Sequence, residues 1–169
     1  SACGGDASDP AAEAASPATS SATESATPVW NPCDGLDAAA VGEALGGAVV
    51  KDDGEPDAPR CAFTPVETDG PALNANYLDF PPGLDAAWET MGNVAGAEQD
   101  VAVPGADAGR MVVKVADGSL LITGFVQNGD LIQIVNLVQP SPYDRALAVS
   151  GVRSLLADLS AHAATWSPA

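Results

Sequence analysis

The clearest alternation of apolar and polar residues lies in the C-terminal half of the chain. Residues 111–116, 120–127 and 131–138 form three runs rich in Val, Ile and Leu. Asp117-Gly118 and Asn128-Gly129 separate these runs, and such pairs between apolar runs are strong short-range signals of a β-hairpin. The pattern predicts a three-stranded antiparallel meander.

Two-residue turns also fix which side chains share a face of the meander. One face is almost wholly apolar, and we expect it to be the core: it holds Met111, Val113, Val115, Leu120, Ile122, Gly124, Val126, Leu131, Gln133, Val135 and Leu137. The other face is mixed: it holds Arg110, Val112, Lys114, Leu121, Thr123, Phe125, Ile132, Ile134, Asn136 and Val138. This mixture is too apolar for a freely solvated surface, so we expect something to cover part of it.

A long amphipathic helix follows the meander. Leu147, Val152, Leu155 and Leu159 recur at helical spacing. The preceding segment 141–144 offers Ser as the N-cap, Pro at the first helical position and Asp at the third. We expect a helix of some 20 residues, packed on the meander.

The region before the meander predicts shorter elements. Asp37 is a good N-cap, and Gly46 stands where a helix would end. The expected elements are a helix over 38–45, a strand over 48–51, an acidic turn, a strand that begins at residue 60, a strand over 72–80 and a helix over 84–91, with a β pattern resuming after 101–103. The predicted fold class is α+β, an antiparallel sheet of the C-terminal meander plus N-terminal strands, packed by the long C-terminal helix and two short helices.

The first 29 residues have a different composition. They are built almost entirely of Ala, Ser, Thr, Gly, Pro and acidic residues, and no large apolar residue occurs before Val29. Such a segment cannot bury enough surface to offset the entropy of ordering it. We therefore expect residues 1–29 to form a disordered tether and residues 30–169 to form one α+β domain.

Cys3, near the start of the expected tether, is a candidate lipidation site. Ser1-Ala2-Cys3-Gly4-Gly5 is similar to the end of a bacterial lipobox, in which small residues precede a cysteine that receives a diacylglyceryl group. Acylation of Cys3 would also account for the odd number of cysteines, because Cys33 could then pair with Cys61. The alternative is a cytosolic protein in which Cys33 and Cys61 are buried free thiols.

Charge excludes one class of partner. The net charge is −17, with only two lysines and four arginines. Nucleic acid would repel such a chain, and no basic cluster overcomes that repulsion. No apolar run approaches the ~20 residues that a membrane-spanning helix needs, so we expect membrane attachment through the N-terminal lipid.

The chain lacks the usual catalytic patterns, and we expect a protein that is not an enzyme. His162 is the only histidine, and no catalytic serine motif accompanies it. One histidine and three cysteines are a poor zinc set, and the acidic stretch 52–57 lacks the ligand spacing of an EF-hand loop. We therefore expect no metal and no cofactor. A cell-wall hydrolase with paired carboxylates is the enzymatic alternative.

The mixed sheet face supplies the candidate binding patch. Large apolar side chains stand on it where a groove could hold a lipid tail or a partner segment. The predicted patch combines these side chains with an aromatic residue from outside the meander: Val112, Phe125, Ile132 and Ile134, with Trp88 or Tyr77.

Several motifs resemble one family. Asn31-Pro32-Cys33-Asp34-Gly35-Leu36, a short helix, and Arg60-Cys61-Ala62-Phe63 are similar to the DUF3558-type lipoproteins of actinobacteria. The stretch 103–108, Val-Pro-Gly-Ala-Asp-Ala, is similar to that family's G-x-G-D-A step, with Ala106 in place of a glycine. The resemblance covers about residues 30–160 and implies an extracytoplasmic lipoprotein without an assigned catalytic activity. A weaker similarity, in architecture only, is to PsbP/Mog1-like domains.

Together these features predict a location and a broad role. We expect a membrane-anchored extracytoplasmic lipoprotein that acts as a non-enzymatic binding module for an envelope protein. The alternative is a carrier or sensor of a small amphiphile in an internal pocket. The sequence does not distinguish the two.

Overall fold

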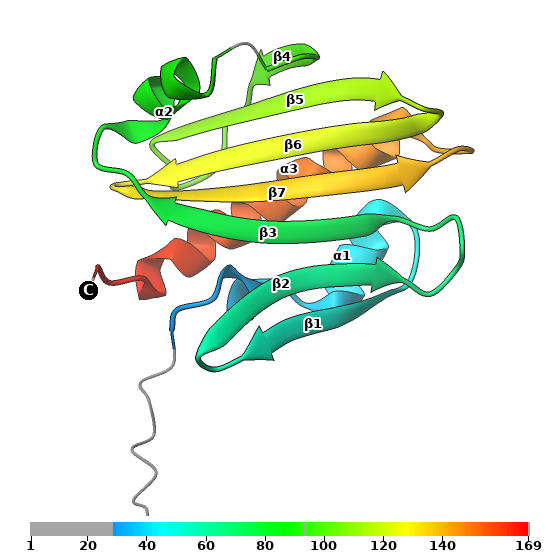
Figure 1. The fold of residues 1–169 in the computed structure, drawn as a ribbon, viewed down its shortest axis with the longest axis horizontal. Coiled ribbons are helices and arrows are strands. Elements are labelled where there is room, and N and C mark those ends of the chain that lie inside the picture. The colour runs from blue at the N-terminus through cyan, green and yellow to red at the C-terminus, as the bar shows by residue number, and fades with distance from the viewer. Residues whose placement is uncertain (1–28, 93, 169) are drawn as a thin grey trace, which may run out of the picture.

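The strands of the described chain lie in one antiparallel sheet, in the order β1-β2-β3-β7-β6-β5-β4 (Figure 1). A computed structural model describes residues 29–92 and 94–168. The strands are β1 (Val49–Glu55), β2 (Ala58–Pro65), β3 (Ala72–Asp79), β4 (Ala97–Asp100), β5 (Ala108–Ala116), β6 (Ser119–Asn128) and β7 (Leu131–Pro140). The helices are η1 (Pro32–Gly35), α1 (Ala38–Leu45), α2 (Gly83–Met91), α3 (Arg145–His162) and η2 (Ala163–Thr165). The predicted α+β class is confirmed.

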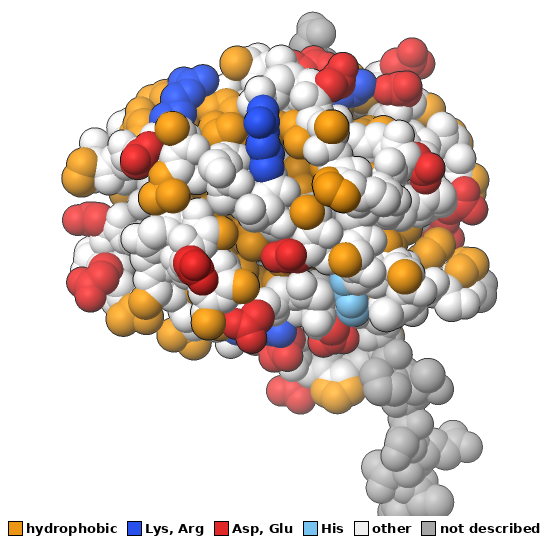
Figure 2. Space-filling view, turned by 180° about the vertical axis from the view of Figure 1, so that it is seen from behind, with side chains coloured by type: hydrophobic (Ala, Val, Ile, Leu, Met, Phe, Trp, Pro, Cys, Tyr) orange, Lys and Arg blue, Asp and Glu red, His pale blue; other side chains and the backbone are white. Residues whose placement is uncertain are grey.

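The helices divide between the two faces of the sheet. Helix α3 crosses one face, with α1 beside it, and α2 lies on the opposite face at one end (Figure 1). Seen from behind, this side of the molecule carries scattered acidic side chains among apolar and uncharged ones, with a few basic side chains in the upper part of the view (Figure 2). No helix in the described part of the chain is long and apolar enough to cross a membrane.

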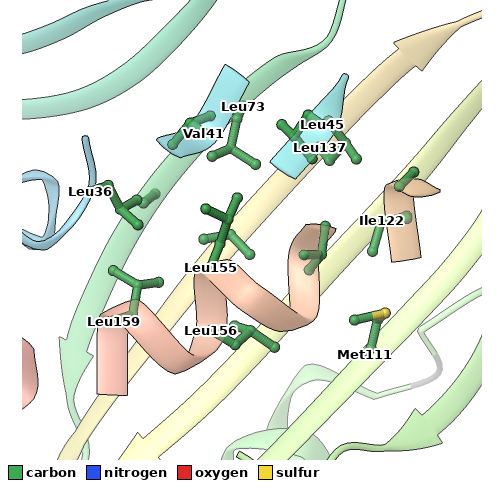
Figure 3. Close-up of a cluster of buried hydrophobic side chains, with 14 of the residues drawn as sticks. Leu36, Val41, Leu45, Leu73, Met111, Ile122, Leu137, Leu155, Leu156 and Leu159 are labelled. Carbon is green, nitrogen blue, oxygen red and sulfur yellow. The ribbon is translucent and has the colours of Figure 1, made fainter. Parts of the chain in front are cut away.

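The main core fills the space between α3 and the sheet. Leu155, Leu156 and Leu159 of α3 are fully buried there, together with Val41 of α1 and Ile122 of β6 (Figure 3). The expected core face of the meander is buried as predicted, with one exception. Val115 is 52% exposed; it lies near the end of β5, which pairs with β6 there but extends beyond β4, whose pairing with β5 stops at Val113.

The meander itself is confirmed, with a small shift in one turn. Asn128 pairs with Leu131, so Gly129 and Asp130 form the second turn, where Asn128 and Gly129 were expected. The shift leaves every side chain on its predicted face, because it changes the pairing of β6 with β7 by two residues: Val126 lies opposite Gln133 and not opposite Leu131.

Three local expectations are corrected. Asp144, which accepts a hydrogen bond from Leu147 N at 3.0 Å, is the N-cap of α3, so the helix begins at Arg145 and not at the proline before it. The acidic stretch after Lys51 continues β1 as far as Glu55 and is not all turn. Strand β4 was not expected, because Ala97–Asp100 is an edge strand without apolar alternation.

The predicted disulfide is present. Cys33 in η1 is bonded to Cys61 in β2, with a Cα–Cα distance of 5.0 Å and both residues buried. The bond therefore ties the entrance of the folded region to the second strand. The lipidation of Cys3 and the expected tether, except Val29, lie outside the described residues.

We predict that the disulfide stabilises the fold strongly. Replacing both Cys33 and Cys61 by Ala should lower the free energy of unfolding by about 3–4 kcal/mol, because the bond closes a loop of 28 residues in the unfolded chain. Urea unfolding of the full chain measures the loss. Dithiothreitol should lower the stability of the wild type to the same level and leave the double variant unchanged. A loss below about 1 kcal/mol would contradict this account.

Candidate functional site

Helix α2 is anchored to the mixed sheet face through a side chain of β6. No side chain of its own segment caps the helix at Pro82. Instead, Gln127 Oε1 accepts a hydrogen bond from Leu84 N at 2.8 Å, while Gln127 Nε2 donates to Gly129 O at 3.0 Å. The start of α2 is therefore fixed to the β6–β7 turn by one glutamine.

A second, smaller core forms where α2 meets the sheet. Leu84 and Ala87 of α2 pack against Phe125 and Ile132, which are only 4% and 1% exposed. Trp88 lies edge-on to Phe125, with 5.3 Å between ring centroids. The helix thus covers part of the mixed face, as expected from its apolar content.

Arg110 holds the flank of α2 against the edge of the sheet. Its guanidinium lies 4.6 Å from the centroid of the Trp88 ring, and Nη2 is 2.9 Å from Asp85 Oδ1. The same group reaches Glu98 and Asp100 on β4, at 3.5 and 3.4 Å. Its side chain is largely buried while two of these carboxylates are well exposed, so stacking on the aromatic ring accounts for much of its ordering.

An apolar cleft opens between α2 and strands β3, β6 and β7. Its volume is about 170 Å³. The lining residues are Leu84, Ala87, Thr90 and Met91 of α2, Phe80 before it, and Leu78, Phe125, Ile132 and Ile134 of the sheet. Met91 is 47% exposed, so an apolar side chain at the end of α2 lies beside the cleft and faces solvent. We call this space the α2 cleft.

The structure brings together four of the six predicted patch residues. Phe125, Ile132 and Ile134 contribute to the cluster under α2, and Trp88 packs on it from the helix. These are the residues that line or border the α2 cleft.

The other two predicted patch residues lie elsewhere. Val112 is buried on the same face of β5, but beneath the segment that enters β4, where Gly96 approaches it closely. Tyr77 lies on the opposite face, because it pairs with Gln133, and its ring meets Trp30 at 4.9 Å. Leu78, which pairs with Ile132, occupies the place near Phe125 that was considered for Tyr77.

Sequence reasoning missed the α2 side of the cleft. Leu84, Ala87 and Met91 follow each other at helical spacing, and this pattern could have marked them as one apolar face. Leu78 could be assigned only through the pairing of β3 with β7, which joins segments more than fifty residues apart.

A row of hydrogen bonds joins uncharged polar side chains of the mixed face. Thr123 Oγ1 donates to Asn136 Oδ1, and Asn136 Nδ2 donates to Asn74 Oδ1, each at 3.1 Å. This row runs across β6, β7 and β3 beside the part that α2 covers. The face is therefore mixed because it is divided between a helix-covered region and a hydrogen-bonded polar region.

Two comparisons with known proteins found no match for the chain. No protein-family model matches the chain, and no curated protein is similar to it at a significant level. The resemblance to DUF3558-type lipoproteins therefore stays a prediction. Within the ranges 29–92 and 94–168, no three His, Cys, Asp or Glu side chains come together in a way that could hold a metal ion.

We predict that Gln127 controls the order of α2. In Gln127→Leu, the cap on Leu84 N is lost, and the helix should be destabilised by about 1 kcal/mol. Amide hydrogen exchange over residues 84–91 should then accelerate about fivefold. Gln139→Leu is the matched control, since that glutamine caps no helix among the described residues. Equal exchange in the two variants would exclude this role for Gln127.

Proposed function

We propose that this chain is an extracytoplasmic, lipid-anchored binding module without catalytic activity, and that its α2 cleft holds an apolar side chain of an envelope protein. The observation that carries the proposal is the cleft itself, an apolar space between a short helix and a sheet. Buried pockets of this kind receive the anchor residues that supply most of the binding energy in protein interfaces.

The size of the cleft favours a protein partner over a carried lipid. An apolar cavity of about 150 Å³ takes up benzene, whereas pockets for drug-sized ligands span about 300–1,000 Å³. At about 170 Å³, the α2 cleft has room for one large apolar side chain. A long acyl chain would have to leave most of its length in solvent. The carrier of a small amphiphile is thus the second candidate, supported by the apolar lining alone.

Two features support the proposed location of the protein outside the cytoplasm and at the membrane. The disulfide between Cys33 and Cys61 indicates an oxidising, extracytoplasmic compartment. The lipid anchor, which would place the protein at the membrane, is supported by the small residues before Cys3 and by the similarity to actinobacterial lipoproteins. A lipid anchor would hold the module at the membrane surface, where envelope proteins are within its reach.

We predict that Met91 contacts the partner. A photoreactive amino acid at position 91 should crosslink one envelope protein in intact cells, and the same amino acid at position 147 should not. Leu147 is the matched position, because it is also an exposed apolar residue, 42% exposed, but lies on α3 on the other side of the sheet.

Affinity measurements with that purified partner then test the cleft directly. Met91→Asp should weaken binding about thirtyfold or more, which is the loss expected for a hot-spot residue, and Leu147→Asp should leave binding unchanged. Equal binding by both variants would refute the α2 cleft as the docking site. Native mass spectrometry of the full chain tests the second candidate: a stoichiometric acyl-chain adduct, absent from Met91→Asp, would favour the carrier.

We predict that Cys3 carries the anchor. When the precursor is expressed in an actinobacterial host, the wild type should partition with the membrane and gain the mass of a diacylglyceryl group. Cys3→Ala should appear in the soluble fraction without that mass. Membrane association of Cys3→Ala, together with an unmodified wild type, would show that the anchor is assigned wrongly.

A further inference from the structure

Strands β2 and β3 separate soon after they meet. They pair only at Ala62 with Asn74 and at Phe63 with Leu73. Beyond these two pairs, β2 stays with β1, whereas all eight residues of β3 pair with β7. Figure 1 shows this separation of β2 from β3. A cleft of about 440 Å³ lies between the two strands.

The segment that enters η1 forms the floor of this cleft. Asn31 and Pro32 line it, between walls made by residues 59–62 of β2 and 74–77 of β3. Asn31 Nδ2 donates to the carbonyl oxygen of Arg60 at 3.1 Å, and the adjacent disulfide joins η1 to the same strand. We call this space the β2–β3 cleft. Its floor is fixed to β2 and packs on β3, because the rings of Trp30 and Tyr77 meet edge-to-face.

The wall formed by β3 continues into a free backbone edge. Phe80 N donates to Asp130 O, which fixes the phase of the ladder: even-numbered residues of β3 exchange hydrogen bonds with β7. The backbone N–H and C=O groups of the odd-numbered residues Tyr77 and Asp79 therefore point to the other side of β3, where β2 no longer pairs with it. Among the described residues, no backbone or side-chain group forms a hydrogen bond with these N–H and C=O groups.

The two outer edges of the sheet are protected by other means. Strand β1 carries Asp52, Asp53 and Glu55 and has a register irregularity between residues 52 and 54, both of which discourage strand addition. Strand β4 is only four residues long. The inner edge of β3 is longer than β4 and has no register irregularity; its five residues from Ala75 to Asp79 span about 17 Å and include one carboxylate, Asp79.

We propose that the β2–β3 cleft is a second docking site, which binds an extended, basic peptide segment of a partner protein by adding it as a strand to β3. The free N–H and C=O groups of Tyr77 and Asp79 select an extended main chain. The proposal stands apart from the α2 cleft, because it rests on backbone groups of β3 that do not line that cleft.

Acidic residues near the β2–β3 cleft favour a basic peptide as the occupant. Asp34 follows the floor, Asp57 precedes the β2 wall and Asp79 ends the β3 edge, and all three are exposed. Arg60 is the one cation that lines the cleft, and its Nη1 lies 3.3 Å from Asp52 Oδ2. Lysine or arginine residues that flank an extended segment would therefore meet a negative rim, in a chain of net charge −17.

The test uses a synthetic probe and the full chain. The probe is a seven-residue peptide of alternating threonine and valine with a lysine at each end. We expect it to shift the ¹⁵N–¹H signals of Tyr77 and Asp79 and the indole signal of Trp30. The same peptide with N-methyl groups on the edge-facing amides should bind at least tenfold more weakly, because those hydrogen bonds cannot form.

Charge variants test the rim. Replacing both Asp57 and Asp79 by Asn should weaken binding of the lysine peptide about two- to tenfold, since each exposed carboxylate contributes modestly. Asp69→Asn is the matched control, because Asp69 lies in the β2–β3 connection, beyond the paired end of the two strands. Met91→Asp should bind the peptide as the wild type does, so failure at one cleft is distinguishable from failure at the other.

Four results would overturn the proposal. The first is no shift at Tyr77 and Asp79 at millimolar peptide, and the second is equal binding of the N-methylated peptide. The third is a set of shifts confined to β1 or β4, which would mean addition at an outer edge. The fourth is a concentration-dependent dimer that shifts the same two amides without peptide, which would make a second copy of the chain the occupant.

Discussion

The structure depends on how closely α3 packs against the centre of the sheet. A Cβ atom on Gly124 of β6 would stand 3.0 Å from Val152 Cγ1 and 3.2 Å from Leu156 Cδ1, so a larger residue there would press directly on the side chains of the helix. The buried Gln133 Nε2 donates to Leu159 O at 2.7 Å and fixes the far end of the same contact. Because one helix occupies this face so tightly, the apolar side chains of the opposite face need a different cover.

That opposite face is covered only in part, and the α2 cleft results. Helix α2 has nine residues, enough to bury Phe125 and Ile132 but too few to cross the sheet. The hydrogen-bonded row of Thr123, Asn136 and Asn74 occupies the adjoining surface. Between the two lies an apolar cleft whose helix is held at its start by Gln127 and on its flank by Arg110. The end of α2 that borders the cleft has neither restraint, which leaves Met91 free to adapt to a partner.

Sequence patterns predicted the parts of this fold that depend on neighbours in the chain. The two hairpin turns fixed the faces of β5, β6 and β7, and a mixed composition indicated a partly covered face. The position of Tyr77 was not resolved, although the alternation of Leu73 and Ala75 with two asparagines places Tyr77 on the core side. The separation of β2 from β3 was not predicted, because it depends on long-range contacts: Asn31 donates to Arg60 O where the strands part, and the disulfide joins η1 to β2.

The central claim is that the α2 cleft accepts one apolar group, and benzene is the most direct probe of it. Titration of the full chain, followed through ¹³C-labelled methyl groups, should shift Ile132, Ile134 and Met91 and saturate at one benzene per chain. Ile122, which is fully buried in the main core, should not respond. Unchanged methyl signals at the cleft, or equal shifts at Ile122, would contradict the account.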